Sequence, residues 1–421
     1  MTKSGLAARE GAAFLLNQVL DERQLLTAAL NAPVIARLDP ADRARAQRLA
    51  TDTLRGLERA DRLLEPHLRK APPVPILNLL RLGTMELAHG EAAHGVVDAM
   101  VELASRSQRH VRLKGLVNAV LRKMAEDAPE AWPKMRVPRL PEWLRGPLIE
   151  AWGAEAVKAM EQAHFAGAPL DLTVKPGATQ VPESAETLPT GSLRLTDPGQ
   201  VSALAGYDSG DWWVQDAAAA LPAKILAPVA GENILDLCAA PGGKTLQLVA
   251  EGATVTAVDL SEHRMATVRA NMDRTKLNAG TVVGDAFNQT GQYDAVLLDA
   301  PCSATGTIRR HPDLPHARDG SGIAELIDLQ TRMLAHAWTL VKPGGRLVYC
   351  TCSLIPDEGE VQVEEALALY PDMSADTDAL TLPGIDPEWV TEEGGLRLRP
   401  DYWADRGGMD GFYIACLRKA V

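Results

Sequence analysis

Apolar side chains recur at helical spacing through the first part of the chain. Between residues 3 and about 125 they fall every three or four positions, as in Leu15, Leu16 and Val19. No alternation of period two interrupts this pattern, and Pro40 stands where the first turn of a helix tolerates proline. The pattern predicts an all-α bundle.

The pattern changes after a segment containing Pro129, Pro133 and Pro138, which we interpret as a linker. Two more helices are expected after it, and short alternating stretches then predict a small α+β subdomain between about 140 and 210. The expected helices cover 142–152 and 155–164, and the expected strands 170–175, 193–196 and 212–215.

From residue 216 onward apolar strands alternate with helical segments, which predicts a mostly parallel, doubly wound Rossmann-like α/β sheet. The expected strands are 233–237, 254–258, 281–283, 294–298, 346–350 and 411–417, and the expected helices 216–226, 243–251, 262–277, 325–341 and 358–369. We therefore expect three parts: a helical bundle over 1–130, a linker subdomain over 131–210 and an α/β domain over 211–421.

The first strand of this domain runs into a tight turn. It ends at Asp236, the turn passes through Pro241, Gly242 and Gly243, and a helix opens at Lys244. Such a turn presents free N–H groups at a helix start, and two glycines let a ligand approach the main chain. The glycine spacings of dinucleotide and phosphate loops are absent, so the pattern predicts a nucleotide-type cradle without pyrophosphate.

Acidic residues follow the strands of the same sheet. Asp259 ends the second strand, where a carboxylate can accept hydrogen bonds from ribose hydroxyls, and Asp285 and Asp299 end two others. A ligand with a ribose but no phosphate is the natural inference. S-adenosylmethionine fits this description.

Composition limits the surroundings of this site. The 421 residues suffice for two or three domains, and 46% hydrophobic content is ample for their cores. No apolar run approaches ~18 residues and the N-terminus lacks a signal-peptide core, so we expect no membrane span. Five cysteines argue against a disulfide framework and favour the reducing cytoplasm. The histidines show no ligand spacing, so no metal is expected.

The charge is unevenly distributed. The net charge is −12, yet residues 1–140 hold 22 Lys and Arg against 16 Asp and Glu, while the remainder holds 21 against 39. A basic N-terminal module is compatible with a polyanionic substrate, although an ordinary arginine-rich helical surface is an equal alternative. Its most basic helix, 110–122, carries Arg112 and Lys114 and either faces RNA or packs in solvent.

Two cysteine segments carry the candidate chemistry. Asp299 and Cys302 follow one buried strand, and Cys350 and Cys352 end another, so both should face the same crevice. Carbon 5 of a pyrimidine needs a thiolate on carbon 6 before it can accept a methyl group. A carboxylate at N3 and the 4-amino group would stabilise the charge that develops, and Asp299 is placed for that role.

Three segments, DLCAAPGGKT, DAPCSATG and YCTCSL, closely resemble motifs of the Sun family of RNA (cytosine-C5) methyltransferases. The resemblance implies that Cys352 is the nucleophile and that Cys302 assists product release. It also implies a set of cofactor contacts: Asp259 at the ribose, Asp285 near the adenine, Asp299 near the methionine end and the target base, and the loop Cys238, Ala239, Ala240, Pro241, Gly242, Gly243 and Lys244.

The N-terminal helices resemble the NusB-like RNA-binding module of antitermination factors. This combination implies a cytosine in 16S ribosomal RNA as the substrate, and we expect a monomer. A non-catalytic RNA-binding or assembly factor with a vestigial site, and a methyltransferase acting on tRNA, are the alternatives. Two intact cysteines with an intact loop favour the enzyme.

Several residues have simpler interpretations. Cys238 is as well explained by packing, Cys350 and Cys416 are expected to be core thiols, and Lys244 could be solvated. Arg309 and Arg310 follow the Cys302 segment, and we expect them to contact RNA phosphates from a loop over the crevice; an ordinary surface loop is the alternative.

Overall fold

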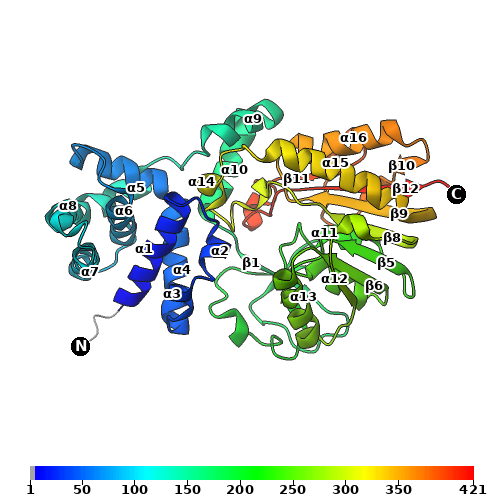
Figure 1. Ribbon diagram of the computed structural model, residues 1–421, viewed down its shortest axis with the longest axis horizontal. Coiled ribbons are helices and arrows are strands. Elements are labelled where there is room, and N and C mark those ends of the chain that lie inside the picture. The colour runs from blue at the N-terminus through cyan, green and yellow to red at the C-terminus, as the bar shows by residue number, and fades with distance from the viewer. Residues whose placement is uncertain (1–4) are drawn as a thin grey trace. The chain divides into compact units, whose positions relative to one another are not determined.

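The structure is a computed structural model that describes residues 5–421, and the chain divides into two compact units. The first comprises the chain as far as Ala166 together with Ile308–Gly320, and the second comprises Gly167–Thr307 and Ser321–Val421. The two helices expected in the linker thus group with the helical bundle, and the small sheet groups with the α/β domain. Figure 1 shows the elements of both units.

Every regular element of the first unit is a helix, as the apolar period predicts; residues 3 and 4 of that expectation lie outside the described chain. The α-helices are α1 (Leu6–Leu20), α2 (Leu26–Ala29), α3 (Pro33–Ala36), α4 (Pro40–Arg55), α5 (Leu57–Leu64), α6 (Val74–Ala88), α7 (Ala93–Arg106), α8 (Lys114–Ala131), α9 (Glu142–Trp152), α10 (Ala154–Ala166) and α14 (Leu314–Ala317). Pro40 occupies the first turn of α4, as expected.

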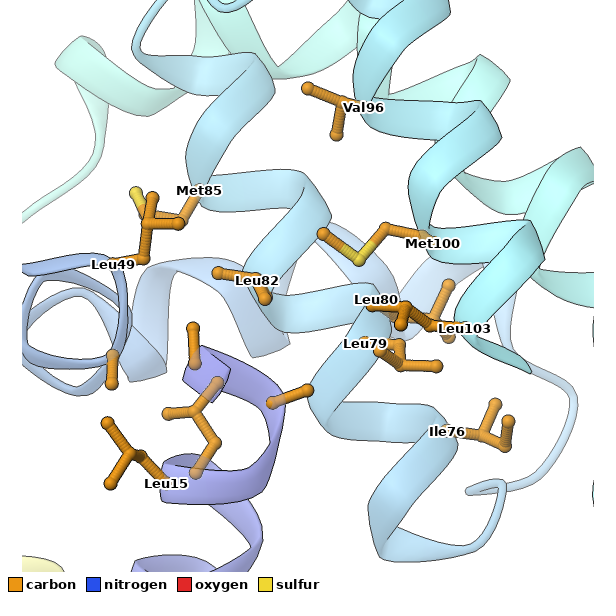
Figure 2. Packing of buried hydrophobic residues seen from close by; sticks show 14 of the residues in the cluster. Leu15, Leu49, Ile76, Leu79, Leu80, Leu82, Met85, Val96, Met100 and Leu103 are labelled. Carbon is orange, nitrogen blue, oxygen red and sulfur yellow. The ribbon is translucent and has the colours of Figure 1, made fainter. Parts of the chain in front are cut away.

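The core of this unit lies between its longest helices. Leu15 of α1, Leu49 of α4, Leu82 of α6 and Met100 of α7 belong to one buried cluster, part of which Figure 2 shows. Leu15, Leu82 and Met100 have no solvent exposure. Burial of each such side chain contributes about 1.5–3 kcal/mol to stability, so helices that are marginal alone fold together.

One expected helix boundary is wrong. Pro129 was expected to mark the linker, but it lies inside α8, which ends at Ala131. Proline has no N–H to donate to the carbonyl four residues earlier, which weakens the helix at this point, and α8 ends two residues later.

The second unit contains two sheets. The smaller has the order β2-β3-β1-β4 and is antiparallel throughout. Its strands are β1 (Leu170–Val174), β2 (Glu186–Thr187), β3 (Leu193–Leu195) and β4 (Trp212–Val214). The buried guanidinium of Arg194 donates to both carboxylate oxygens of Asp171, at 2.7 and 2.6 Å, and so ties β3 to β1.

The larger sheet has the order β10-β12-β9-β8-β5-β6-β7, and β11 also pairs with β12. The strands from β9 to β7 are parallel, whereas β12 runs antiparallel to β9, β10 and β11. Their bounds are β5 (Asn233–Leu237), β6 (Thr254–Asp259), β7 (Gly280–Val283), β8 (Tyr293–Asp299), β9 (Val341–Thr351), β10 (Met373–Ala375), β11 (Leu396–Leu398) and β12 (Phe412–Lys419). This is the Rossmann-like architecture that the alternation predicts.

Helices cover both faces of the larger sheet (Figure 1). One face carries α15 (Ile323–Thr339) and α16 (Glu360–Leu369), and the other carries α11 (Leu221–Leu226), α12 (Gly243–Ala250) and α13 (Glu262–Thr275). Side chains alternate between the two cores: Leu298 faces α15, whereas Leu297 faces α11. Because β5, β6, β8 and β9 are parallel, their carboxyl ends lie along one edge of the sheet, and that edge carries the candidate site.

Candidate active site

The cofactor loop follows β5, as predicted, and α12 begins at Gly243, the first residue of the expected helix 243–251. Gly242 has φ +101°, a conformation in which a side chain would be strained. The N–H of Gly242 donates to Ala239 O at 2.8 Å, and the Ala239 N–H donates to Val258 O of β6 at 2.9 Å. The turn is therefore held both by itself and by the neighbouring strand.

Asp236 lies fully buried beneath this loop. Its Oδ2 accepts a 2.5 Å hydrogen bond from the Thr245 hydroxyl, whereas its Oδ1 is buried and has no hydrogen-bond partner among residues 5–421. Burial raises the pKa of Asp236 to about 7, and the hydrogen bond from Thr245 only partly offsets this. The carboxyl group thus has an unused oxygen aimed at the loop.

Asp259, at the end of β6, lies beside the loop as expected. Its Oδ2 accepts from the Ala240 N–H at 3.2 Å and its Oδ1 from the Ser261 N–H at 3.0 Å. Arg264 approaches Oδ2 at 3.5 Å and donates to Ala240 O at 2.6 Å. These contacts fix the orientation of the Asp259 carboxylate, and the residue is only 3% exposed.

Asp285 follows β7 at the same edge and remains exposed. Its carboxylate accepts from the Phe287 N–H at 3.0 Å and begins a short 3-10 helix, Ala286–Asn288. Asp259 thus ends β6 and Asp285 follows the neighbouring strand β7, and their cofactor contacts stay a prediction.

Lys244 is paired rather than solvated, and its side chain is only 11% exposed. Its Nζ donates to Asp299 Oδ2 at 2.8 Å and lies 5.2 Å from the centre of the Phe412 ring. Burial alone would lower the pKa of this ammonium, but the attraction of Asp299, together with those of Cys350 and Cys352, outweighs it and the pKa of Lys244 is raised. The first turn of α12 therefore holds a cation against the carboxylate that ends β8.

The two candidate cysteines meet. Cys302 Sγ lies 3.5 Å from Cys352 Sγ, and both side chains are half-buried. The hydrogen bond with Cys352, reinforced by burial, raises the pKa of Cys302 well above its usual range. The Gly306 N–H also donates to Cys352 O at 2.9 Å, so the loops after β8 and β9 are joined through the main chain as well.

Two of the other cysteines, Cys350 and Cys416, are more deeply buried than this pair. Cys350 and Cys416 are fully buried between the sheet and α11, in line with the simpler interpretation of both. Cys350 Sγ lies 3.5 Å from Asp299 Oδ1, and burial followed by this carboxylate raises the pKa of Cys350. Burial also raises the pKa of Cys238 to about 12, so this thiol stays neutral beside the loop.

One expected RNA contact is wrong. Arg309 is fully buried in the first unit, where its carbonyl oxygen accepts from Arg55 at 3.1 Å. Burial, with a contribution from the charge of Arg309, lowers the pKa of the neighbouring His164 to about 3. A guanidinium without solvent access cannot meet a phosphate, whereas Arg310, the next residue, is exposed.

Arg112 and Lys114 are both exposed at the start of α8. Arg112 lies in the short 3-10 helix Val111–Leu113, and Lys114 is the first residue of α8. Their RNA contact stays a prediction.

The sequence analysis missed Glu358, which is fully buried behind the two cysteine loops. It accepts hydrogen bonds from Ser303 and Ser353, the residues that follow Cys302 and Cys352. Its position six residues after Cys352, beyond a proline, gave no periodic or motif signal of its own.

Comparison with known proteins identifies the relationship of both parts of the chain. The model of the 16S rRNA methyltransferase RsmB/F family matches residues 223–418, and that of the NusB family matches residues 6–126. A protein of Sodalis glossinidius (strain morsitans), named ribosomal RNA small subunit methyltransferase B, is 36% identical over 402 residues, covering 89% of this chain and 92% of its own length. This chain belongs to the family of ribosomal RNA small subunit methyltransferase B.

Other members of the family align over still more of the chain. The protein of the same name from Cronobacter sakazakii (strain ATCC BAA-894) is 35% identical over 99% of this chain and 100% of its own length. Among solved structures, that of PH0851 matches 100% of this chain and 99% of its own with a TM-score of 0.75 and 22% identity, which shows a shared fold. A methyltransferase homologue from Pyrococcus horikoshii has 27% identity and a TM-score of 0.52, covering 65% of this chain and 93% of its own.

As a member of this family the chain is an S-adenosylmethionine-dependent methyltransferase, and the cofactor loop fits that donor. The unpartnered Oδ1 of Asp236 suits a hydrogen bond from the amino group of the cofactor, and Asp259 and Asp285 offer carboxylates beside the turn. The bound cofactor supplies an electrophilic methyl group on a sulfonium.

Two further observations concern a metal site and a membrane span. Among residues 5–421, no three His, Cys, Asp or Glu side chains gather as a metal site would require. None of the helices in the same range combines the length and hydropathy of a bilayer-spanning segment.

Proposed function

We propose that this chain methylates carbon 5 of a cytosine in 16S ribosomal RNA, through a covalent bond between Cys352 and carbon 6 of the base. The observation that carries the proposal is the 3.5 Å contact between Cys302 and Cys352 at the edge that holds the cofactor loop. The substrate class is supported by the curated relatives, which are named for the ribosomal RNA of the small subunit.

Cys352 is the attacking thiol. Carbon 5 of cytosine is barely nucleophilic until a sulfur bonds to carbon 6 and pushes electron density onto carbon 5. The pKa of Cys302 is raised, first by its hydrogen bond to Cys352 and then by burial, so Cys302 keeps its proton and we assign the attack to Cys352. The attack forms the S–C6 bond, and the electrons of the C5=C6 double bond become available to the methyl group.

Asp299 stabilises the ring during this attack. Its Oδ2 is held by Lys244, and it lies on the strand that leads to Cys302. A carboxylate directed at N3 and the 4-amino group favours the polarised ring that forms when sulfur adds to carbon 6. Lys244 fixes the carboxylate in place and so limits the reorganisation needed.

Cys302 completes the reaction. Once the Cys352 sulfur is bonded to carbon 6, it can no longer accept a hydrogen bond from the Cys302 thiol as an anion. The main cause of the raised Cys302 pKa is then lost. Cys302, after giving up its proton to solvent, removes the hydrogen on carbon 5. The C–H electrons re-form the C5=C6 bond and expel the Cys352 sulfur as a thiolate.

The target base must leave its stack before sulfur can reach carbon 6, which requires a single-stranded segment or base flipping. We assign RNA binding to the NusB-like helices, with Arg112, Lys114 and Arg310 as exposed candidates for phosphate contacts. The basic N-terminal module thus serves an acidic catalytic unit, as its charge suggests.

Tritium release from 16S ribosomal RNA labelled at carbon 5 of cytosine tests the proposal. We expect one tritium released per methyl group incorporated, and no release from Cys352→Ala, which should still bind S-adenosylmethionine. Methylation without tritium release would refute reaction at carbon 5. Absence of both would favour an assembly factor, and release only from labelled tRNA would change the substrate.

A further inference from the structure

Glu358 ends a short 3-10 helix, Pro356–Glu358, and its side chain is fully buried. Four groups donate to its carboxylate. Oε1 accepts from the Ser303 N–H at 2.9 Å and from Gln330 Nε2 at 3.0 Å, and Oε2 accepts from the Ser353 hydroxyl at 2.6 Å and from the Ser303 hydroxyl. All four donors are uncharged, so a buried carboxylate is here stabilised by hydrogen bonds from neutral groups.

These donors come from both cysteine loops. Ser303 follows Cys302 and Ser353 follows Cys352, and their hydroxyls also lie 3.2 Å apart. Gln330 of α15 bridges the carboxylate to Pro301 O, the residue before Cys302, at 2.8 Å. Glu358 therefore holds the main chain beside each thiol within one residue of the sulfur.

The main chain of Glu358 is equally fixed. Its carbonyl oxygen accepts from the Tyr349 hydroxyl at 2.9 Å and from the Thr351 hydroxyl at 3.0 Å, both on β9. The carboxylate is thus anchored to the strand that carries Cys352 and reaches across to the loop that carries Cys302. Removing it should loosen the link between the two loops, which the hydrogen bond from the Gly306 N–H to Cys352 O still joins.

We propose that Glu358 is a positioning residue, which clamps the two cysteine loops together and thereby makes their two thiols chemically unequal. It touches neither base nor cofactor. The inference deepens the proposed function and rests on it for the roles of the two thiols. Its main test does not depend on the proposed function.

The negative charge of Glu358 has an effect beyond geometry. After the hydrogen bond with Cys352 and burial, the charges of Cys352 and Glu358 further raise the pKa of Cys302. Glu358 therefore helps Cys302 keep its proton while Cys352 attacks. The titratable groups that act on this pair from the surrounding elements are Lys244 of α12, Asp299 of β8, Tyr349 and Cys350 of β9, and Glu358 itself.

Two substitutions separate the clamp from the charge. In Glu358→Gln the remaining oxygen can still accept from the Ser303 N–H and Gln330, while the new amide can donate to the two serine hydroxyls, which accept as well as donate. Geometry is then largely kept and the charge is lost. Glu358→Ala removes both.

The experiment measures iodoacetamide labelling of Cys302 and Cys352 against pH in the full-length protein, with each cysteine peptide quantified by mass spectrometry. In the wild type Cys352 should react at lower pH than Cys302. In Glu358→Gln the labelling midpoint of Cys302 should fall by about one pH unit, and kcat should fall about tenfold or more. The affinity for S-adenosylmethionine should stay within about twofold, because the cofactor loop is untouched.

Glu365→Gln, an exposed position on α16, is the matched control and should label like the wild type. Glu358→Ala should raise the labelling of both thiols, since both loops are released. A folded Glu358→Gln variant with wild-type labelling and kcat would overturn the proposal. Should Glu358→Gln not fold, Ser353→Ala removes one donor to the carboxylate; wild-type labelling and kcat in that variant would equally overturn it.

The labelling needs neither RNA nor cofactor. A negative labelling result would leave methylation at carbon 5 standing, provided tritium is released. A failure of tritium release would leave a positive labelling result standing, so the two ideas fail separately.

Discussion

The Sγ atoms of Cys302 and Cys352 lie 3.5 Å apart, although the two residues are fifty positions apart in the chain. Each follows one of two neighbouring parallel strands, β8 and β9, whose register pairs Asp299 with Cys350. The sheet therefore brings the thiols together at its carboxyl edge, beside the carboxylate of Asp299 and the first turn of α12. This pairing places within contact distance the two thiols to which we assign attack and release.

Removal of the releasing thiol should trap the reaction halfway. In Cys302→Ala, Cys352 can still attack carbon 6 and carbon 5 can still accept the methyl group, but no side chain removes the hydrogen on carbon 5. We expect a covalent protein–RNA adduct that migrates slowly on a denaturing gel after incubation with S-adenosylmethionine and ribosomal RNA.

The control for the adduct is Cys302→Ala combined with Cys352→Ala, which should give no slow band. A persistent band in the double variant would assign the bond to another nucleophile. A Cys302→Ala enzyme that turns over normally would show that release does not depend on this thiol.

Motifs made most of the catalytic site predictable. The two cysteine segments, the glycine turn and the acidic strand ends each stand next to an apolar run in the sequence. Since parallel strands place their carboxyl ends along one edge, their proximity followed from topology. The 3.5 Å thiol contact and the Lys244–Asp299 pair did not, because side-chain contacts depend on register and packing that no period encodes.

The errors have physical causes of the same kind. Strands β2, β10 and β11, which are two or three residues long, were not expected from the sequence. The helix expected from residue 216 begins only at Leu221, because the Asp216 carboxylate accepts from the Ala218 N–H and favours a turn. Arginine is a residue type usually found at the surface, and only the fold reveals that the segment of Arg309 belongs to the helical unit.

The buried Asp236 should make stability depend on pH. Its pKa is about 7 in the folded protein and near 3.8 when unfolded, so between these values the folded state binds the extra proton. Stability contributed by this group therefore falls as pH rises from about 4 to 7 and is constant above that range. The full effect is up to about 4 kcal/mol.

Asp236→Asn lacks this titration. Relative to the wild type, the variant should gain free energy of unfolding when urea denaturation is moved from pH 5 to pH 8. The exposed Glu365→Gln should show no such relative gain. An unchanged difference between Asp236→Asn and the wild type at the two pH values would mean that Asp236 is ionised in the fold throughout.

Arg112 and Lys114 should contribute to RNA binding through charge. Each is exposed at the start of α8, so removal of either side chain should leave the fold unchanged. We expect Arg112→Ala and Lys114→Ala each to weaken RNA binding and to lower the slope of log affinity against log salt by about 1. Lys158→Ala, an exposed lysine of α10, is the control. Equal slopes in all three variants would exclude phosphate contacts at the α8 start.

The close approach of Gly306 to Gly411 should make a single methyl group costly. A Cβ on Gly306 would lie 2.0 Å from the Gly411 carbonyl oxygen, closer than any real contact allows, so one of the two loops must move. The same Gly306 donates its N–H to Cys352 O at 2.9 Å and accepts the Gly411 N–H at 2.8 Å. Displacement at this point is therefore transmitted directly to the backbone of Cys352, the proposed nucleophile.

We expect Gly306→Ala to lower kcat about 100-fold, since a shift of roughly 1 Å in a reacting group has that effect. Affinity for S-adenosylmethionine should change little, because Gly306 makes none of the hydrogen bonds described above that hold the cofactor loop. Gly322→Ala, where a Cβ would meet nothing within 4 Å, is the matched control and should retain full activity. Normal kcat in a folded Gly306→Ala enzyme would show that the reaction tolerates a change in the spacing of the two cysteine loops. That outcome would contradict the proposed mechanism, in which Cys302 must lie beside the carbon that Cys352 activates.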